Sequence, residues 1–183
     1  TMQDGEPRQL GVCLRGGEFA WSAVEAPAAL EAEVRAIEED IGAALPEGYS
    51  SEICLRQPAW LGALAGVLGR GLALFTDYGY SRREYYHPQR TAGTLACHYR
   101  HHWHADPFFL PGLQDITAWV DFSAAARAAS AAGLGVAAYT TQAHFLLATG
   151  ILHEMEADMA RDQGQSPGQM QARAAELRRL LMP

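Results

Sequence analysis

Residues 69–80, with the sequence GRGLALFTDYGY, decide the fold of this chain. The apolar run Leu72–Phe75 has no polar alternation, which is typical of a strand covered on both faces. A helical pattern that ends at Gly69 precedes the run, and Asp77 follows its carboxyl end. In an open α/β sheet, ligands bind beyond the carboxyl ends of the strands. The pattern therefore predicts a buried strand over residues 72–76 and a functional site at Asp77.

A hairpin and two helices are predicted upstream of this strand. Apolar residues alternate with polar or small ones over residues 10–23, around a Gly-Gly turn at 15–18. Residues 27–41 carry one apolar stripe, and we interpret the acidic side chains on the remaining face as a solvated helix surface. A second helix is predicted over residues 58–68, where glycines end it.

The region that follows the DYGY motif is less regular. Residues 81–114 show no clear periodicity and are rich in aromatic, histidine and arginine residues. A long loop of this kind inside a compact domain is often functional. Two further strands are predicted, over residues 116–120 and 136–140.

Helices account for the rest of the predicted structure. One is expected over residues 123–132, where Gly133 ends it. The chain beyond the last strand is predicted to be mainly helical, with a break at Gly150. Residues 166–169 have the form of a capping box that opens a final helix ending at Leu181.

Composition excludes several classes of protein. The chain has 183 residues, of which 49% are apolar and 19% charged, so it is globular in character. No apolar run approaches the roughly 18 residues that a membrane span requires. The net charge is −7, which argues against a nucleic-acid binder. The three cysteines, Cys13, Cys54 and Cys97, form no CxxC pair, so we expect free thiols in a reducing cytosol.

A histidine cluster offers two interpretations. Four histidines and an aspartate fall within nine residues: His98, His101, His102, His104 and Asp106. On a helix, His98 and His102 would have the spacing of zinc proteases, but Tyr99 stands where their glutamate would be. A loop that hydrogen-bonds a substrate is the favoured interpretation, and we expect no metal. Nucleophile and phosphate-loop signatures do not occur in a suitable context.

Carboxylates stand at the predicted strand boundaries. Asp77, Asp115 and Asp121 each flank a predicted strand. Asp121 is equally suited to be the N-cap of the following helix. Gln142 lies just beyond the last predicted strand. Together these residues gather polar groups at the ends of two or three strands.

Three stretches in this order resemble one known family. They are LFTDYGY at 74–80, GTLACHYRHHWHADPFFLPGLQDITAWVDF at 93–122, and TTQAHFLLATGI at 140–151. The order is long and specific, and it resembles the MidA-type S-adenosylmethionine-dependent methyltransferases. That family includes the mitochondrial methyltransferase that assists assembly of respiratory complex I. The resemblance covers nearly the whole chain.

The resemblance implies a fold. The chain would be the C-terminal half of a Rossmann-like class I methyltransferase sheet, with strands 5, 6 and 7 of that α/β fold. Residues 1–68 would form an inserted hairpin and two-helix subdomain, 69–150 the second half of the α/β domain, and 151–183 the C-terminal helices. The glycine-rich loop and the acidic residue that bind S-adenosyl-L-methionine in this family are expected in a missing N-terminal half.

The resemblance also implies a function, namely methylation of a protein arginine side chain. A hydrogen-bonding acidic pocket suits a guanidinium, and a carboxylate can accept its proton. Asp77 and Asp115 are therefore the expected catalytic residues, and which of them is the base is left open. The expected substrate-binding residues are Tyr78, Gly79, Tyr80, His101, His104, Thr117 and Gln142.

Two alternatives of other classes remain. The first is a non-catalytic assembly or chaperone module that keeps the fold and binds a protein partner. The second, weaker one is a metal-dependent hydrolase built on the histidine loop. We expect a protein substrate, no nucleic acid and no membrane insertion. Self-association as a homo-oligomer would follow from an exposed sheet edge. A bacterial cytoplasmic location is expected, and a mitochondrial one for eukaryotic relatives.

Overall fold

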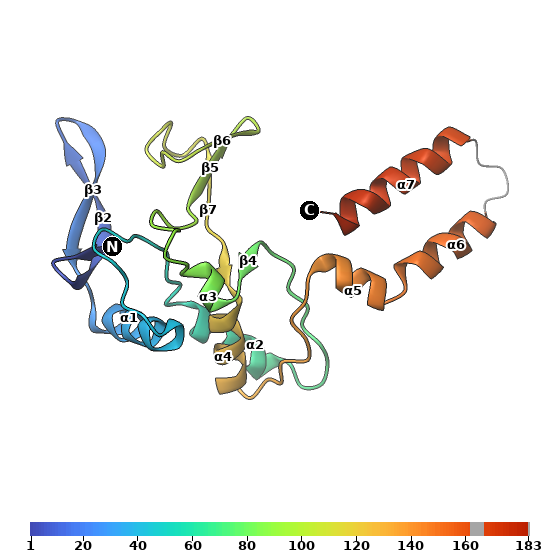
Figure 1. Ribbon diagram of the computed structural model, residues 1–183, viewed down its shortest axis with the longest axis horizontal. Coiled ribbons are helices and arrows are strands. Elements are labelled where there is room, and N and C mark those ends of the chain that lie inside the picture. The colour runs from blue at the N-terminus through green and yellow to red at the C-terminus, as the bar shows by residue number, and fades with distance from the viewer. Residues whose placement is uncertain (162–166, 183) are drawn as a thin grey trace. The chain divides into compact units, whose positions relative to one another are not determined.

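The structure is a computed structural model that describes residues 1–161 and 167–182 (Figure 1). The chain divides into two compact units, residues 1–135 and residues 136–183. The first unit holds three small sheets and four helices within an α/β arrangement, and the described part of the second unit is helical.

The first unit opens with an antiparallel sheet of β1 (Met2–Gln3), β2 (Glu6–Arg15) and β3 (Glu18–Glu25). Arg15 pairs with Glu18 at the hairpin end, and Gly16 and Gly17 between them have φ angles of 64° and 90°. Two consecutive residues with positive φ make the turn that suits the twist of a hairpin. The predicted hairpin is confirmed.

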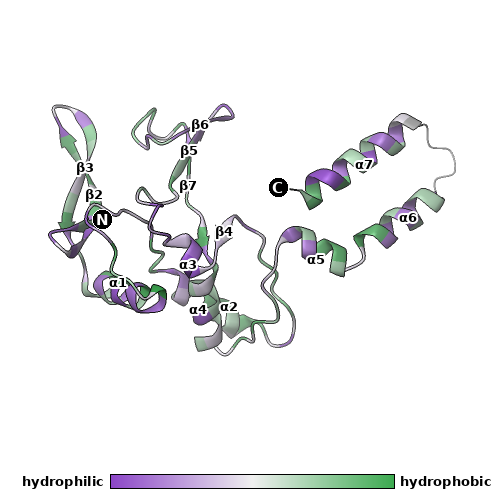
Figure 2. Cartoon of the chain, viewed as in Figure 1, coloured by the Kyte–Doolittle hydropathy of each residue, from purple (hydrophilic) through white to green (hydrophobic). Residues whose placement is uncertain are grey.

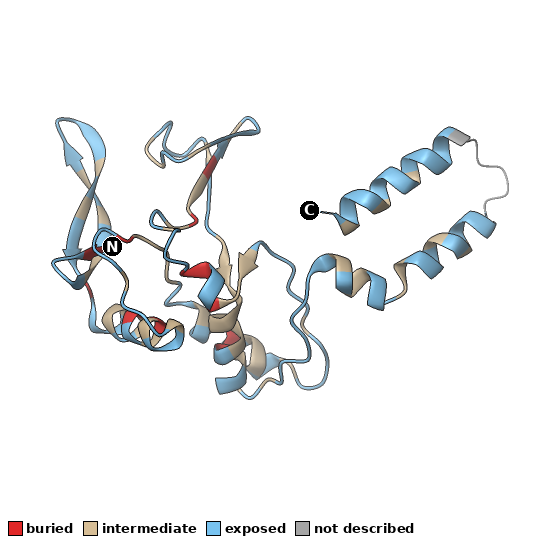
Figure 3. Cartoon of the chain, in the orientation of Figure 1, coloured by how far each residue is buried: buried red, intermediate tan, exposed pale blue. Residues whose placement is uncertain are grey.

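The main core lies where the apolar stripe of α1 (Ala28–Ile41) meets the segments around Tyr49 and α3 (Arg82–Tyr85). Figure 3 shows buried residues on both α1 and α3. Gly42, with a φ of 73°, ends α1 as a left-handed cap. Figure 2 shows that α1 also carries hydrophilic residues, in agreement with the solvated acidic surface predicted for this helix. The buried cluster consists of Met2, Val34, Ile37, Tyr49, Tyr85 and Tyr86.

Helix α2 (Gln57–Val67) packs against α4 (Phe122–Ala131). A two-residue parallel pair, β4 (Gly79–Tyr80) with β8 (Val120–Asp121), lies next to α4. Both helices agree with the sequence prediction. The subdomain boundary predicted at residues 68 and 69 stays a prediction.

Residues 72–76 and 136–140, which were predicted to be strands, form no strand in this structure because neither segment has a ladder partner. Leu72 and Leu74 are 73% and 58% exposed. A strand exists only where a second backbone supplies hydrogen bonds, and no described segment supplies them here. The predicted strand over 116–120 is instead split into β7 (Asp115–Thr117) and β8.

The segment predicted as a long loop, 81–114, contains regular structure. It holds α3 and the antiparallel strands β5 (Ala96–Tyr99) and β6 (His102–His104), and β7 completes the sheet in the order β6-β5-β7. Arg100 and His101 form the hairpin turn, with φ angles of 49° and 65°. This turn was not predictable from the residue types, because positions of this kind usually hold asparagine or glycine.

The second unit consists of α5 (Gln142–Ala148), α6 (Ile151–Arg161) and α7 (Pro167–Leu181). Gly150, with a φ of 90°, separates α5 from α6, which confirms the predicted break. The predicted boundary at residues 150 and 151 falls inside this unit. Ser166 of the predicted capping box lies outside the described residues. Among the described helices, none is long and apolar enough to cross a membrane.

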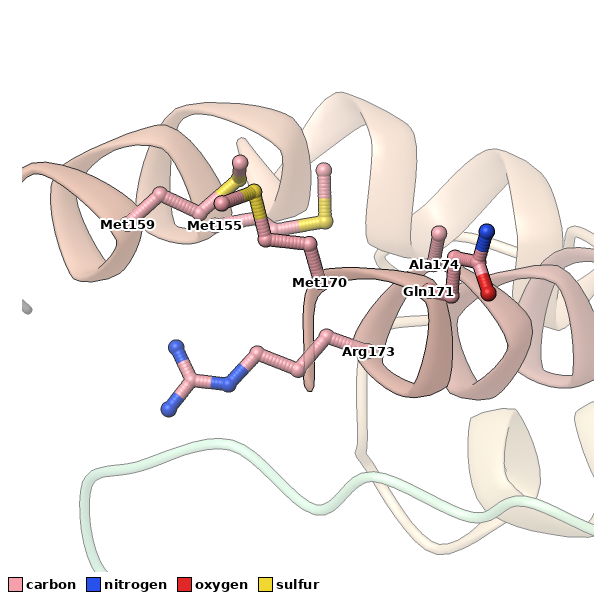
Figure 4. A pocket seen from close by; sticks show the side chains of 6 residues that line it. All are labelled: Met155, Met159, Met170, Gln171, Arg173 and Ala174. Carbon is pink, nitrogen blue, oxygen red and sulfur yellow. The ribbon is translucent and has the colours of Figure 1, made fainter. Parts of the chain in front are cut away.

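A methionine-lined groove of about 300 Å³ lies between α6 and α7. Met155 and Met159 of α6 face Met170 of α7 in Figure 4. An ion pair of 3.2 Å between Arg173 and Asp158 joins the two helices. No described residue of this unit is buried, so its apolar side chains remain accessible.

Candidate functional site

The DYGY motif lies beside the end of β8. The exposed carboxylate of Asp77 accepts a hydrogen bond of 2.8 Å from the Tyr78 amide. The Val120 amide donates to the Tyr78 carbonyl at 2.9 Å. The motif thus follows an extended segment and meets a second strand end, although the segment before it is not itself a strand.

Tyr80 is engaged in packing. Its ring lies 4.8 Å from that of Trp119, measured between centroids. The guanidinium of Arg90 lies over both rings, 4.7 Å from the Tyr80 centroid and 5.6 Å from that of Trp119. The Tyr80 ring therefore has a structural role in this packing. Its predicted role in substrate binding stays a prediction.

Gly79 has a steric reason to be glycine. A β-carbon at this position would overlap the Val120 carbonyl oxygen and lie 2.8 and 2.9 Å from two ring atoms of Phe122. Contacts this short do not occur for real side chains, and the carbonyl belongs to the backbone. The close approach of β4 and β8 therefore depends on Gly79.

Asp121 caps α4, as one of the two interpretations of the sequence anticipated. Its carboxylate accepts from the Ala124 amide at 3.0 Å and from Arg82 Nε at 3.2 Å. Arg82 is only 4% exposed and also pairs with Glu33 at 2.7 Å and Asp40 at 2.9 Å. A buried guanidinium with three carboxylate partners is well compensated. This cluster holds α1, α3 and the start of α4 together.

Sequence reasoning missed a second polar cluster, centred on Glu52. Its carboxylate accepts from the Thr94 amide at 2.9 Å, the Thr94 hydroxyl at 2.8 Å, the Leu95 amide at 3.2 Å and the Tyr85 hydroxyl at 3.3 Å. A side chain at Gly93 would overlap the same carboxylate. No local sequence pattern predicts this cluster, because Glu52 lies 42 residues from Thr94.

Burial of this region shifts the ionisation of two tyrosines. Desolvation raises the pKa of Tyr85 and of Tyr86 above the ordinary value of 10.0. The Tyr85 hydroxyl donates to the Trp119 carbonyl at 3.1 Å, and a bond of 3.2 Å joins it to the Thr94 hydroxyl. Both phenols are therefore neutral structural groups at neutral pH.

The histidines of the cluster lie on strands and not on a helix. His98 belongs to β5, His102 and His104 to β6, and His101 to the exposed turn between them. His104 Nδ1 accepts from the Asp106 amide at 3.3 Å, and its ring meets Phe109 edge-on at 5.2 Å. Within the described ranges, no group of three or more histidine, cysteine, aspartate or glutamate residues is arranged to hold a metal ion.

Cys97 is fully buried beneath the same sheet. Desolvation, and secondarily the negative charge of Asp106, raises the pKa of its thiol. A raised pKa lowers the thiolate fraction, so Cys97 is unsuited to nucleophilic chemistry.

Asp115 and Thr117 are two residues apart on β7 and therefore project from the same face of the sheet. Both are exposed. The Thr117 hydroxyl donates to the Ala96 carbonyl at 3.2 Å. These two predicted site residues are close together because they are two residues apart on one strand. Gln142 lies in the second unit, where its amide donates to the Leu180 carbonyl at 2.9 Å.

A shallow groove of about 320 Å³ is lined by Asp40, Ser81, Arg82, Arg83 and Ser123. It lies over the ion-pair cluster of Arg82. Because that guanidinium is already paired with three carboxylates, Arg82 itself has little charge left for an incoming ligand.

Comparison with known proteins extends these observations. A family model described as "putative S-adenosyl-L-methionine-dependent methyltransferase" matches residues 1–140. The chain is 37% identical to a Burkholderia thailandensis protein whose crystal structure contains S-adenosyl-homocysteine, with a TM-score of 0.83. A native structure of a protein of the same superfamily from that organism gives the same identity and TM-score.

Both matches cover 98% of this chain but only 44% and 46% of the solved chains. The chain thus spans less than half the length of these relatives. No curated protein matches it. The family model nevertheless covers most of the sequence, including the hairpin, the DYGY motif and the β6-β5-β7 sheet. The chain therefore belongs to the family of S-adenosyl-L-methionine-dependent methyltransferases that this model describes.

Proposed function

We propose that this chain is the acceptor-binding part of an S-adenosyl-L-methionine-dependent methyltransferase that modifies a protein arginine. The observation that carries the proposal is the similarity, over 98% of the chain, to a structure that contains S-adenosyl-homocysteine. That molecule is what S-adenosylmethionine becomes when it has given up its methyl group. The arginine acceptor and the MidA-type assignment rest on the sequence resemblance.

The described residues do not themselves fit the donor. Nucleotide-like cofactors in such folds sit on a glycine-rich loop that joins a strand to a helix. Here β4 is followed after Ser81 by α3, and β8 runs directly into α4, so neither junction contains a glycine. We therefore place the donor on residues outside this chain, in a protein of the length of its solved relatives.

The acceptor, in contrast, has partners here. Guanidinium groups bind carboxylates through parallel N–H donors, and a carboxylate can also take up the proton that a methylated nitrogen loses. Asp115 is exposed and can do both. One oxygen of Asp77 already accepts from the Tyr78 amide, which leaves its other oxygen for a substrate. Asp115 is accordingly the stronger candidate for the base.

The same proposal accounts for the two extended apolar segments. Residues 72–76 and 136–140 would become strands of a Rossmann-like sheet once strands from the other part of the protein lie alongside them. The support is that Leu72, Leu74 and Phe75 are exposed apolar residues on a backbone without ladder partners. An edge of this kind is also where the isolated chain would self-associate.

Calorimetric titration of S-adenosylmethionine tests the proposal. The measurement compares this 183-residue chain with a form extended upstream to the full gene product. Micromolar binding by the extended form alone is the expected result. The absence of binding to both forms, when circular dichroism shows them folded, would overturn the proposal and favour a non-catalytic assembly module.

A further inference from the structure

The β6-β5-β7 sheet places three chemically different side chains in one row. Trp103 on β6 pairs with His98 on β5, and His98 pairs with Asp115 on β7. Residues directly opposite one another in antiparallel strands project from the same face. Neighbouring strands lie about 4.8 Å apart, so the row from indole to carboxylate spans about 10 Å.

The face of this sheet opposite the row is mixed in exposure. It carries Cys97, which is fully buried, and His104, whose Nε2 atom is buried, but also Ile116, which is 54% exposed. On the row face, His98, Trp103 and Asp115 are all exposed, and Trp103 retains 65% of its accessible surface. A large aromatic side chain this exposed beside polar groups is typical of a binding surface.

Two polar groups of this face, those of Asp115 and Thr117, can only accept hydrogen bonds from a ligand. The Asp115 carboxylate has no hydrogen-bond or ion-pair partner among the described residues. Thr117, on the same face, has already committed its hydroxyl hydrogen to the Ala96 carbonyl, so its free lone pairs can only accept. A ligand that satisfies both must bring at least two hydrogen-bond donors.

A guanidinium has this chemistry, with five N–H donors in a rigid plane and no acceptor. Asp115 and Thr117 are two residues apart, about 6.8 Å along the strand. A planar fork can direct separate N–H groups to two such acceptors, whereas an ammonium is a compact point charge. The pair therefore favours arginine over lysine.

The rest of the row suits the remainder of an arginine side chain. From Asp115, the methylene stem would cross His98 toward Trp103, where apolar surface is available. Arginine stems bury readily against such surfaces while the charged end stays hydrogen-bonded. Between the carboxylate and the indole, the row holds the imidazole of His98 and no carboxylate or guanidinium.

We propose that the row face of the β6-β5-β7 sheet binds the arginine side chain of the acceptor, with Asp115 and Thr117 receiving the guanidinium and Trp103 covering its stem. This inference rests on the proposed function and adds the surface and two residues, His98 and Trp103, that the predicted site did not include.

The test uses the 183-residue chain and end-blocked Gly-Gly-X-Gly-Gly peptides, in which X is arginine, lysine or the neutral analogue citrulline. The Trp103 indole N–H signal in a ¹H–¹⁵N spectrum, assigned by its loss in Trp103→Phe, reports binding. We expect the arginine peptide to shift this signal and the Asp115 and Thr117 amides. Citrulline should leave all three unchanged, and lysine should bind more weakly.

Asp115→Asn should weaken arginine binding about tenfold, since the charge of the carboxylate is lost and one of its two acceptor oxygens becomes a donor. The matched control is Asp4→Asn in the β1–β2 turn, which removes the same charge at an exposed site whose positive φ asparagine tolerates. Equal shifts with arginine and citrulline, or equal affinities of the two variants, would overturn the inference. Donor titration of the extended protein is independent, so a failure here would leave the methyltransferase proposal standing.

Discussion

Replacement of Gly79 by alanine tests the structural role of this glycine in the DYGY motif. The new β-carbon would overlap the Val120 carbonyl and press on the Phe122 ring, with contacts of 2.8 and 2.9 Å. Overpacking costs about 1–3 kcal/mol, and we expect about 3 kcal/mol because a backbone atom cannot rotate away. With a urea dependence of about 2 kcal/mol per molar, the unfolding midpoint should fall by about 1.5 M.

Tryptophan fluorescence during urea unfolding reports the stability of the unit that contains Gly79, residues 1–135. All four tryptophans lie within residues 1–135, and Trp119 stacks on Tyr80 beside the altered position. Gly62→Ala in α2 is the matched control, because a β-carbon there meets nothing within 4 Å. It should stabilise the protein by about 0.5–1 kcal/mol, the helical advantage of alanine over glycine. An unchanged midpoint for Gly79→Ala would refute the steric argument.

Three further variants or conditions probe the polar clusters. Arg82→Met should cost about 3–5 kcal/mol in urea unfolding, because it leaves the nearly buried carboxylate of Asp121 without its cation; a loss below about 1 kcal/mol would contradict this. The pKa of Tyr85 is raised in the folded state, so unfolded chains lose this proton first and stability should fall as pH rises above 10.0. Unfolding midpoints at about pH 8 and about pH 11 should differ less in Tyr85→Phe than in the parent. In iodoacetamide labelling followed by mass spectrometry, Cys54 should react readily and Cys97, buried with a raised pKa, only after unfolding.

Local patterns in the sequence were enough to predict the helices and the first hairpin. The apolar stripe of α1 and the Gly-Gly turn between β2 and β3 each specify their element through nearby residues alone. The run Leu72–Phe75 has an equally clear pattern but forms no strand, since a ladder needs a second backbone that the pattern cannot supply.

The candidate site was predictable in part. Asp115 and Thr117 could be named as candidates from the sequence. Which residues share their face of the β6-β5-β7 sheet could not be predicted from it. The β5–β6 hairpin turns at Arg100 and His101, residues that give no turn signal, so the alignment of His98 with Trp103 and Asp115 was hidden. Glu52 was missed because its donors lie about forty residues away, where no local periodicity links them.

The ion-pair cluster of Arg82 imposes an order on folding during synthesis. Its partners Glu33 and Asp40 leave the ribosome 49 and 42 residues ahead of it, and Asp121 follows 39 residues later. At ~5–20 residues per second, the 42 residues from Asp40 to Arg82 take about 2–8 s to make. Throughout that interval α1 carries acidic groups without their central cation. The nascent N-terminal hairpin and α1 therefore remain solvated until the middle of the chain, which contains Arg82, has been made and can dock onto them.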